Sequence, residues 1–227
     1  KIVLNSKNIF IIFQNKDDKK EILLKRNYLP HLIIPGSGVD LVKFNFIEED
    51  VTQVPKITMI SRLLVHKGVL EFFEAAKLIK EEGVKAQFEL IGDLDTDNPA
   101  CLPLEQYEQI KGSGNIILRG YIEDIALELK KTNLVVLPSY REGFPKVLIE
   151  ASACGRAIIT TDVPGCRDVV KHQDNGLLVP KEDPYELAKA IKYLIENPTE
   201  RREMGLKNRK IAESRYSIDQ VVNAHIK

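Results

Sequence analysis

The sequence has no tryptophan, two methionines and three cysteines in 227 residues. The cysteines, Cys101, Cys154 and Cys166, are too far apart to form a CxxC pair. An odd number of cysteines without a spacing pattern argues against a disulfide framework and indicates a reducing compartment. We therefore expect a cytoplasmic protein that folds without disulfide bonds.

The sequence also lacks an excess of charge of either sign and any long apolar run. Its 33 basic and 33 acidic residues cancel, which argues against a broad nucleic-acid-binding surface. No apolar run approaches the roughly 20 residues of a membrane helix, and no signal peptide is recognisable. The chain starts KIVLNSKNIF, without an initiator methionine, and enters an apolar run within ten residues. This start is typical of a fragment, so we expect part of the functional site to lie outside the sequence.

Short apolar segments alternate with amphipathic ones from residue 56 onward. Strands are expected at residues 57–61, 86–92, 115–120, 134–138, 157–161 and 176–180. Segments with a helical period of apolar residues lie between these strands. One of them has an apolar face made of Val69, Phe72, Phe73, Ala76 and Ile79. Such alternation predicts an α/β domain with a Rossmann-like, doubly wound parallel sheet and helices on both faces, over residues 56–197.

The two flanks do not belong to this alternation. Residues 1–55 read as a strand, a charged helix and a second strand that enters a glycine-rich turn with Gly36 and Gly38. We interpret residues 1–55 as the tail of a preceding N-terminal domain plus a linker. Because residues 1–35 are too short to bury a core, we expect them to dock on the sheet domain. Residues 198–227 are expected to form C-terminal helices.

Candidate ligand-binding residues follow the predicted strands. In open α/β sheets, ligands bind beyond the carboxyl ends of the strands. Arg62 and Lys67 follow the first strand, and Glu142 follows the fourth, immediately before a helix. Two cations near a helix N-terminus suit a phosphorylated ligand. Pro145 fits the first turn of that helix, whose amino end would present the amides of Lys146 and Val147.

Glu150 lies inside the same apolar helix without an obvious local partner. Its carboxylate can accept two hydrogen bonds from vicinal hydroxyls, as on a ribose, and Glu142 can do the same for a sugar. The alternative is that the eight-residue spacing is chance. In that case Glu142 is solvated and Glu150 pairs with a neighbouring lysine or arginine. The two glutamates alone do not decide between these interpretations.

The run EGFPKVLIE, preceded by LPSYR and followed by ASACGRAIITTDVPGCRDVV, resembles the E-x7-E signature of retaining family 4 glycosyltransferases. These enzymes have the GT-B fold, of which this chain would supply the C-terminal half. PGSGVD, the SRL-x3-KG loop, the GY after the third strand and NGLLVP follow in the family's order. The similarity covers nearly the whole chain. Among the members of this family, the sequence most resembles bacterial enzymes that build capsule, O-antigen or lipid-linked oligosaccharides.

The resemblance implies donor-binding roles for matching positions. The diphosphate would be held by Arg62 and Lys67, and the transferred sugar by Glu142 with the amides of Gly143 and Phe144. The amides of Lys146 and Val147 would bind phosphate, and Glu150 would bind the ribose. Tyr121 or Ile122 would lie against the base. Many members have glycine where Pro145 stands, so one amide is missing here. Tyr121 has an equally plausible role as a cap on the sheet.

The function implied is transfer of a sugar, with retention, from a nucleotide-diphosphate donor that we expect to be UDP-linked. The acceptor, a glycan or lipid-linked glycan, would bind mostly to the missing N-terminal domain, with peripheral contact at the inner face of the membrane. No metal or other cofactor is expected, because fixed cations take that role. Asp93, Asp95 and Asp97 are better explained by an Asx-rich turn than by a metal site. Two alternatives stay open, a binding fragment without activity and another GT-B enzyme such as a sugar-nucleotide epimerase.

Overall fold

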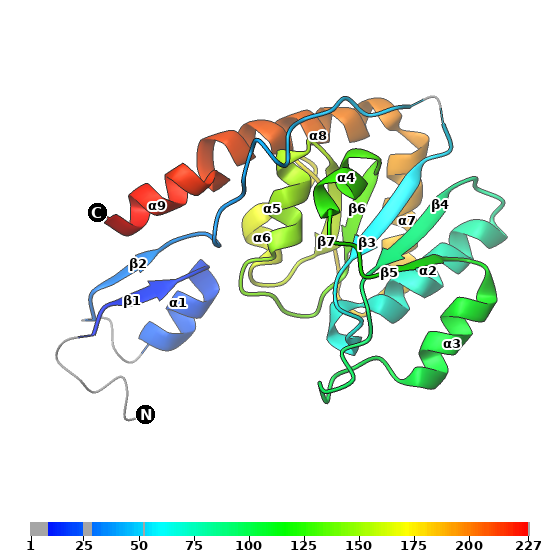
Figure 1. Cartoon of the computed structure of the whole chain (residues 1–227), viewed down its shortest axis with the longest axis horizontal. Coiled ribbons are helices and arrows are strands. Elements are labelled where there is room, and N and C mark those ends of the chain that lie inside the picture. The colour runs from blue at the N-terminus through cyan, green and yellow to red at the C-terminus, as the bar shows by residue number, and fades with distance from the viewer. Residues whose placement is uncertain (1–8, 25–28, 52, 227) are drawn as a thin grey trace.

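The computed structural model describes residues 9–24, 29–51 and 53–226. Within residues 53–226, six parallel strands form a sheet of order β5-β4-β3-β6-β7-β8 (Figure 1). The strands are β3 (Lys56–Ile60), β4 (Gln87–Ile91), β5 (Ile117–Gly120), β6 (Leu134–Leu137), β7 (Ala157–Thr161) and β8 (Leu177–Val179). From β3 the chain adds β4 and β5 on one side, and from β6 it adds β7 and β8 on the other side. This is the strand order of a doubly wound Rossmann-like sheet. The predicted fold class is confirmed.

Helices cover both faces of this sheet because its strands are apolar on both sides. Ile57 and Met59 pack into one core with residues of α2, α3 and α7, whereas Val135 and Leu137 pack into the other with α4, α5 and α6. The covering helices are α2 (Val69–Glu81), α3 (Leu104–Ser113), α4 (Ile125–Lys130), α5 (Lys146–Ala153), α6 (Cys166–Val169) and α7 (Pro184–Glu196). The four-residue helix α6 was not predicted, since it is too short to show a period.

The C-terminal helices form a long arm along the sheet domain, shown in orange and red in Figure 1. They are α8 (Pro198–Ile211), a π-helical turn (Ala212–Tyr216) and α9 (Ile218–Ile226). Buried Arg201 of α8 forms an ion pair with Glu49 and so holds the segment before β3 against the domain. None of the described helices has the length and apolar composition needed to cross a bilayer.

The N-terminal residues form a small unit beside the sheet domain (Figure 1). It consists of β1 (Ile11–Phe13), α1 (Lys16–Leu23) and β2 (His31–Ile33), with β1 and β2 paired in parallel. Only three apolar side chains of its described residues make up its buried core, those of Phe13, Leu23 and Leu29. The unit contacts the sheet domain through a hydrogen bond from Asn15 to the carbonyl of Gly143. The expected docking is therefore seen for the described part of residues 1–35.

Candidate functional site

The neighbouring strands β3 and β6 mark the point where the strand order reverses. After β3 the chain turns toward β4, and after β6 it turns toward β7 on the other side. A crevice forms at the carboxyl ends of strands at such a point, and ligands bind there in this class of fold. Residues 61–68 follow β3 and residues 138–144 follow β6, and these two loops carry the predicted Arg62, Lys67 and Glu142.

The two loops are locked together by backbone contacts. The carbonyl of His66 accepts hydrogen bonds from the amide of Tyr140, at 2.9 Å, and from Ser139 Oγ, at 3.1 Å. Gly68 has φ of 79°, and a Cβ atom on it would lie 2.2 Å from the carbonyl oxygen of Pro138. Only glycine therefore allows the loops to approach this closely. The approach fixes the place of Lys67 relative to the loop after β6.

Lys67 and Glu142 form an ion pair between the two loops, with Lys67 Nζ 2.6 Å from Glu142 Oε1. Their side chains are only 18% and 12% exposed. The alternative in which Glu142 is a solvated charge is therefore wrong. A lysine ammonium has three donors, so Lys67 can bind a phosphate oxygen while it remains close to Glu142. The structure brings together two of the three residues predicted as catalytic, whereas their roles stay predictions.

Helix α5 directs unpaired backbone amides toward the same region. Pro145 is its N-cap in extended backbone, and the helix begins at Lys146. No described residue accepts a hydrogen bond from the amides of Gly143, Phe144, Lys146 or Val147. Free N–H groups at the positive end of a helix dipole attract anions. The four amides predicted to face a donor are thus available for one.

Glu150 lies one turn further along α5, with a side chain that is 12% exposed. Lys146, four residues earlier, places its Nζ 3.6 Å from Glu150 Oε1, so the expectation that Glu150 lacks a local partner is wrong. Burial raises the pKa of Glu150 above its ordinary value, and the charge of Lys146 opposes that shift. Since Lys146 is largely exposed, the pair is loosely held, and Glu150 retains acceptor capacity. Its ribose role stays a prediction.

Arg62, Tyr121 and Ile122 line a separate cavity of about 510 Å³ over the carboxyl ends of β3 and β4. Its other walls include Ile60, Ile91 and Ile125, which make it mainly apolar. Tyr121 is 75% exposed, so it does not cap the sheet as a buried residue would. A mainly apolar recess beside an exposed aromatic ring suits a nucleobase. Arg62 is thus part of the wall of this recess.

The aspartate-rich loop after β4 is engaged by Arg62. Arg62 Nη1 lies 2.7 Å from Asp95 Oδ2, and the amide of Asn98 donates to the carbonyl of Asp95. Within the described part of the chain, no group of three or more metal-ligating side chains is arranged around a common point. The loop forms the turn predicted for it, and its carboxylate sets the position of Arg62.

Several contacts beside the site were not predicted from the sequence. Asn15 bonds to the carbonyl of Gly143, Asp18 lies 3.9 Å from Arg141, and Asp17 lies 3.7 Å from Arg167. The pattern NKDD signals a helix N-terminus at Asn15, and the structure has one there. Nothing in that pattern indicates which distant loop the helix contacts.

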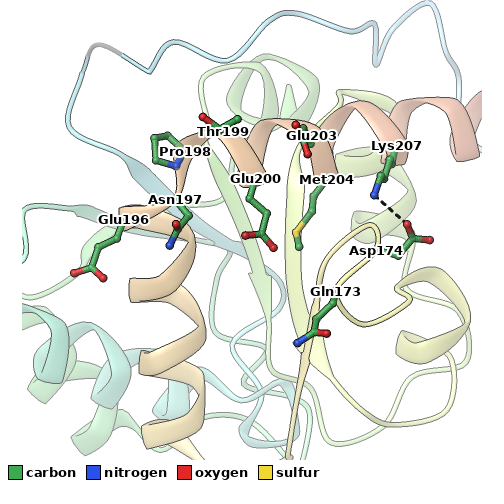
Figure 2. A pocket seen from close by; sticks show the side chains of 10 residues that line it. All are labelled: Gln173, Asp174, Glu196, Asn197, Pro198, Thr199, Glu200, Glu203, Met204 and Lys207. Carbon is green, nitrogen blue, oxygen red and sulfur yellow. Dashed lines mark hydrogen bonds and ion pairs between the residues drawn. The ribbon is translucent and has the colours of Figure 1, made fainter.

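A second hollow lies at the opposite edge of the sheet, before β8 and against α7 and α8 (Figure 2). Its charged lining residues are Asp174, Glu196, Glu200 and Glu203, with the single cation Lys207 bonded to Asp174 at 3.1 Å. None of the predicted site residues lies there. An acidic hollow would repel a phosphorylated ligand, so the crevice between β3 and β6 is the better candidate site.

Comparisons with known proteins identify the family of this chain. The sequence model of the family described as "Glycosyl transferases group 1" matches residues 43–211. The chain is 34% identical over 201 residues to N,N'-diacetylbacillosaminyl-diphospho-undecaprenol alpha-1,3-N-acetylgalactosaminyltransferase of Campylobacter jejuni, covering 83% of this chain and 51% of that protein. It is 31% identical to the capsular polysaccharide biosynthesis glycosyltransferase CapM of Staphylococcus aureus, covering 71% of this chain and 42% of that protein. The chain thus spans about half the length of the curated relatives it matches.

Solved structures establish the fold independently. The crystal structure of Anabaena HepE in complex with UDP superposes with a TM-score of 0.82, covering 96% of this chain and 62% of that chain. The two sequences are 19% identical. A likeness at this identity establishes a shared architecture, while function has to come from the site.

Proposed function

Because this chain belongs to the group 1 glycosyl transferases, we propose that it is the donor-binding half of a retaining glycosyltransferase. The donor is a nucleotide-diphosphate sugar with UDP as its nucleotide. The sugar passes to a growing polysaccharide or a lipid-linked oligosaccharide. The observation that carries the proposal is the Lys67–Glu142 pair beside unpaired amides at the switch point of the sheet.

The donor and acceptor classes are supported by what similar proteins are named for. HepE has been crystallised with UDP and with UDP-glucose. The Campylobacter relative is named for a diphospho-undecaprenol substrate, and CapM is named for capsule biosynthesis. Lipid-linked acceptors favour a cytoplasmic enzyme that works at the inner face of the cell membrane.

In the transfer reaction, the bond between the anomeric carbon and the diphosphate oxygen breaks. The same carbon bonds to an acceptor hydroxyl oxygen, whose proton is released, with overall retention of configuration. Negative charge develops on the leaving diphosphate. Lys67, Arg62 and the amino end of α5 stabilise that charge, and rigid positioning supplies the rest of the rate increase. Fixed cations take the role of a metal ion, so the proposed mechanism needs no metal.

Glu142 and Glu150 divide the recognition of the donor's hydroxyl groups. Glu142, held by Lys67, accepts hydrogen bonds from the transferred sugar, next to the amides of Gly143 and Phe144. Glu150 accepts from the ribose, and the base enters the recess beside Tyr121 and Ile122. The amides of Lys146 and Val147 take phosphate oxygens. Each group thus meets a ligand atom whose chemistry matches its own.

The acceptor binds mainly to a second domain outside this chain. Without that domain, the site is open to water on one side, and transfer should fail even though donor contacts survive. We therefore expect the chain to bind donor nucleotide without transferring sugar, whereas a longer parent protein does both.

The test is a calorimetric titration of the 227-residue chain with UDP, uridine and a panel of UDP-sugars, with and without EDTA. UDP should bind more tightly than uridine, and EDTA should leave its affinity unchanged. Absence of nucleotide binding would refute the donor-site assignment. A strict manganese requirement would restore a metal role for Asp93, Asp95 and Asp97. Product analysis on the longer parent separates transfer from epimerisation, and robust transfer by this chain alone would contradict the two-domain site.

A further inference from the structure

Asn15 joins the N-terminal unit to the loop that carries Glu142. It lies between β1 and α1 and is 1% exposed. Its Oδ1 accepts a hydrogen bond from the amide of Asp18, at 2.7 Å, and so caps α1. Its Nδ2 donates to Asp18 Oδ2 and to the carbonyl oxygen of Gly143, each at 2.8 Å. Capping requires only the first of these bonds, so the bond to Gly143 needs a separate explanation.

Gly165 restrains the same loop from another side. It has φ of 80°, and a Cβ atom on it would lie 2.5 Å from the carbonyl oxygen of Glu142 and 2.6 Å from that of Gly143. A side chain at this position would displace both carbonyls. Two successive carbonyl oxygens therefore face the space beside Gly165, and Asn15 holds the second of them.

Because the peptide unit is planar and trans, holding the carbonyls of Glu142 and Gly143 also fixes the direction of the N–H groups that follow them. In each peptide unit, the N–H group points opposite to the carbonyl. The carbonyls of Glu142 and Gly143 lie on one side, so the N–H groups of Gly143 and Phe144 point away from it. Neither N–H has an acceptor among the described residues. Successive N–H groups that point the same way form an anion-binding concavity.

We infer that Asn15 is a positioning residue that aims the Phe144 amide at the donor, by holding the carbonyl of Gly143. The inference rests on the proposed function for its ligand, and it assigns to the Phe144 amide an oxygen of the phosphate that carries the sugar, a phosphate that UDP retains. The neighbouring ion pairs of Asp17 and Asp18 involve exposed arginines and contribute little. Asn15 is the buried contact. It makes the geometry of the donor loop depend on the docked N-terminal unit.

The test is Asn15→Ser, studied by NMR and calorimetry with UDP as the probe. Serine still caps α1, but its side chain is too short to reach Gly143. Before any ligand is added, the carbonyl carbon of Gly143 should change its chemical shift. The affinity for UDP should fall about fivefold, as expected for one misdirected hydrogen bond. The Phe144 amide should lose its response to UDP, while those of Lys146 and Val147 keep theirs.

A matched control is Asp183→Ser, which alters the N-cap of α7, outside the crevice. It should leave UDP affinity and the Gly143 signal unchanged. An Asn15→Ser variant with wild-type UDP affinity and an unchanged Phe144 response would overturn the inference, as would an unchanged Gly143 carbonyl in the unliganded protein. If the wild-type chain failed to bind UDP, the proposed function would be refuted. The unliganded Gly143 signal would still decide whether Asn15 holds the peptide.

Discussion

At the amino ends of β6 and β8, buried polar side chains bond to one another, whereas at the carboxyl ends of β3 and β6 several polar groups have no described partner. Before β6, Asn133 donates to Glu49 at 2.9 Å, and Glu49 also accepts from Arg201 at 2.7 Å. Before β8, Asn175 donates to Asn208 at 2.7 Å. These groups satisfy each other and tie α8 and the incoming segment to the sheet.

The carboxyl ends differ because their polar groups are only partly used. Lys67 and Glu142 hold each other, but the amides that follow have no described acceptor. The hollow in Figure 2 belongs to the amino-end side, so the presence of a hollow alone does not identify the site. The comparison teaches that closed polar networks mark structural roles, whereas partly unsatisfied groups in a crevice mark binding.

The largest effect is expected from breaking the closed network with Arg201→Met. The change leaves Glu49, with a 6% exposed side chain, without its cationic partner. Loss of one member of a buried pair costs about 3–5 kcal/mol, which urea unfolding would measure. UDP affinity of the folded protein should not change. Replacing both partners, as Arg201→Met with Glu49→Leu, should recover much of the loss, and failure to recover would show that the pair is not the cause.

Lys67→Ala should have the next largest effect, on ligand affinity. The variant removes a cation from the proposed diphosphate site and leaves Glu142 unpaired. We expect UDP affinity to fall by about 3 kcal/mol, the upper range for a bond between charged groups. Uridine affinity should not change. Lys77→Ala, which alters an exposed pair on α2, serves as the control in the same titrations. Equal losses for UDP and uridine would instead indicate a distorted loop.

Glu150→Gln should have a smaller effect on binding, because glutamine keeps one acceptor oxygen. We expect UDP affinity to fall by about 1.5 kcal/mol, near the lower limit for a charged hydrogen bond. Unchanged affinity by calorimetry would remove Glu150 from the ribose site.

The same variant tests the cost of burying this carboxylate. Burial raises the pKa of Glu150 above its ordinary 4.5, so the folded state binds the proton more tightly than the unfolded state. This contribution is present below the unfolded pKa and is lost as pH rises through the folded value. Glu150→Gln should therefore be more stable than wild type at pH 7, with little difference at acid pH. An unfolded variant would show that the pair with Lys146 is structural.

Arg62→Ala should have the smallest effect of these substitutions. The side chain is 63% exposed, and its partner Asp95 lies on a surface loop, so stability should not change measurably. UDP affinity should fall about threefold, with uridine affinity unchanged, because a solvated cation contributes weakly. A loss as large as that of Lys67→Ala would place Arg62 in direct contact with the diphosphate.

Some features of the site were readable in the sequence and others were not. The six strands were predictable because short apolar runs recur between helical periods. The pairing of Glu150 with Lys146 was also readable, since residues four apart on a helix are neighbours. The short turn with Lys67 (Val65–Lys67) and the helix α6 are too short to show a period in the sequence. Only the structure therefore reveals them.

The sequence by itself determined that Arg62, Lys67 and Glu142 share one edge of the sheet. Each follows a strand, and all parallel strands end at the same edge. Only the tertiary structure decided which atoms meet there. Lys67 and Glu142 are 75 residues apart, and Asn15 and Gly143 are 128 apart. A hydrogen bond forms only within about 3 Å, and that distance depends on loop backbone and docking that no local pattern encodes.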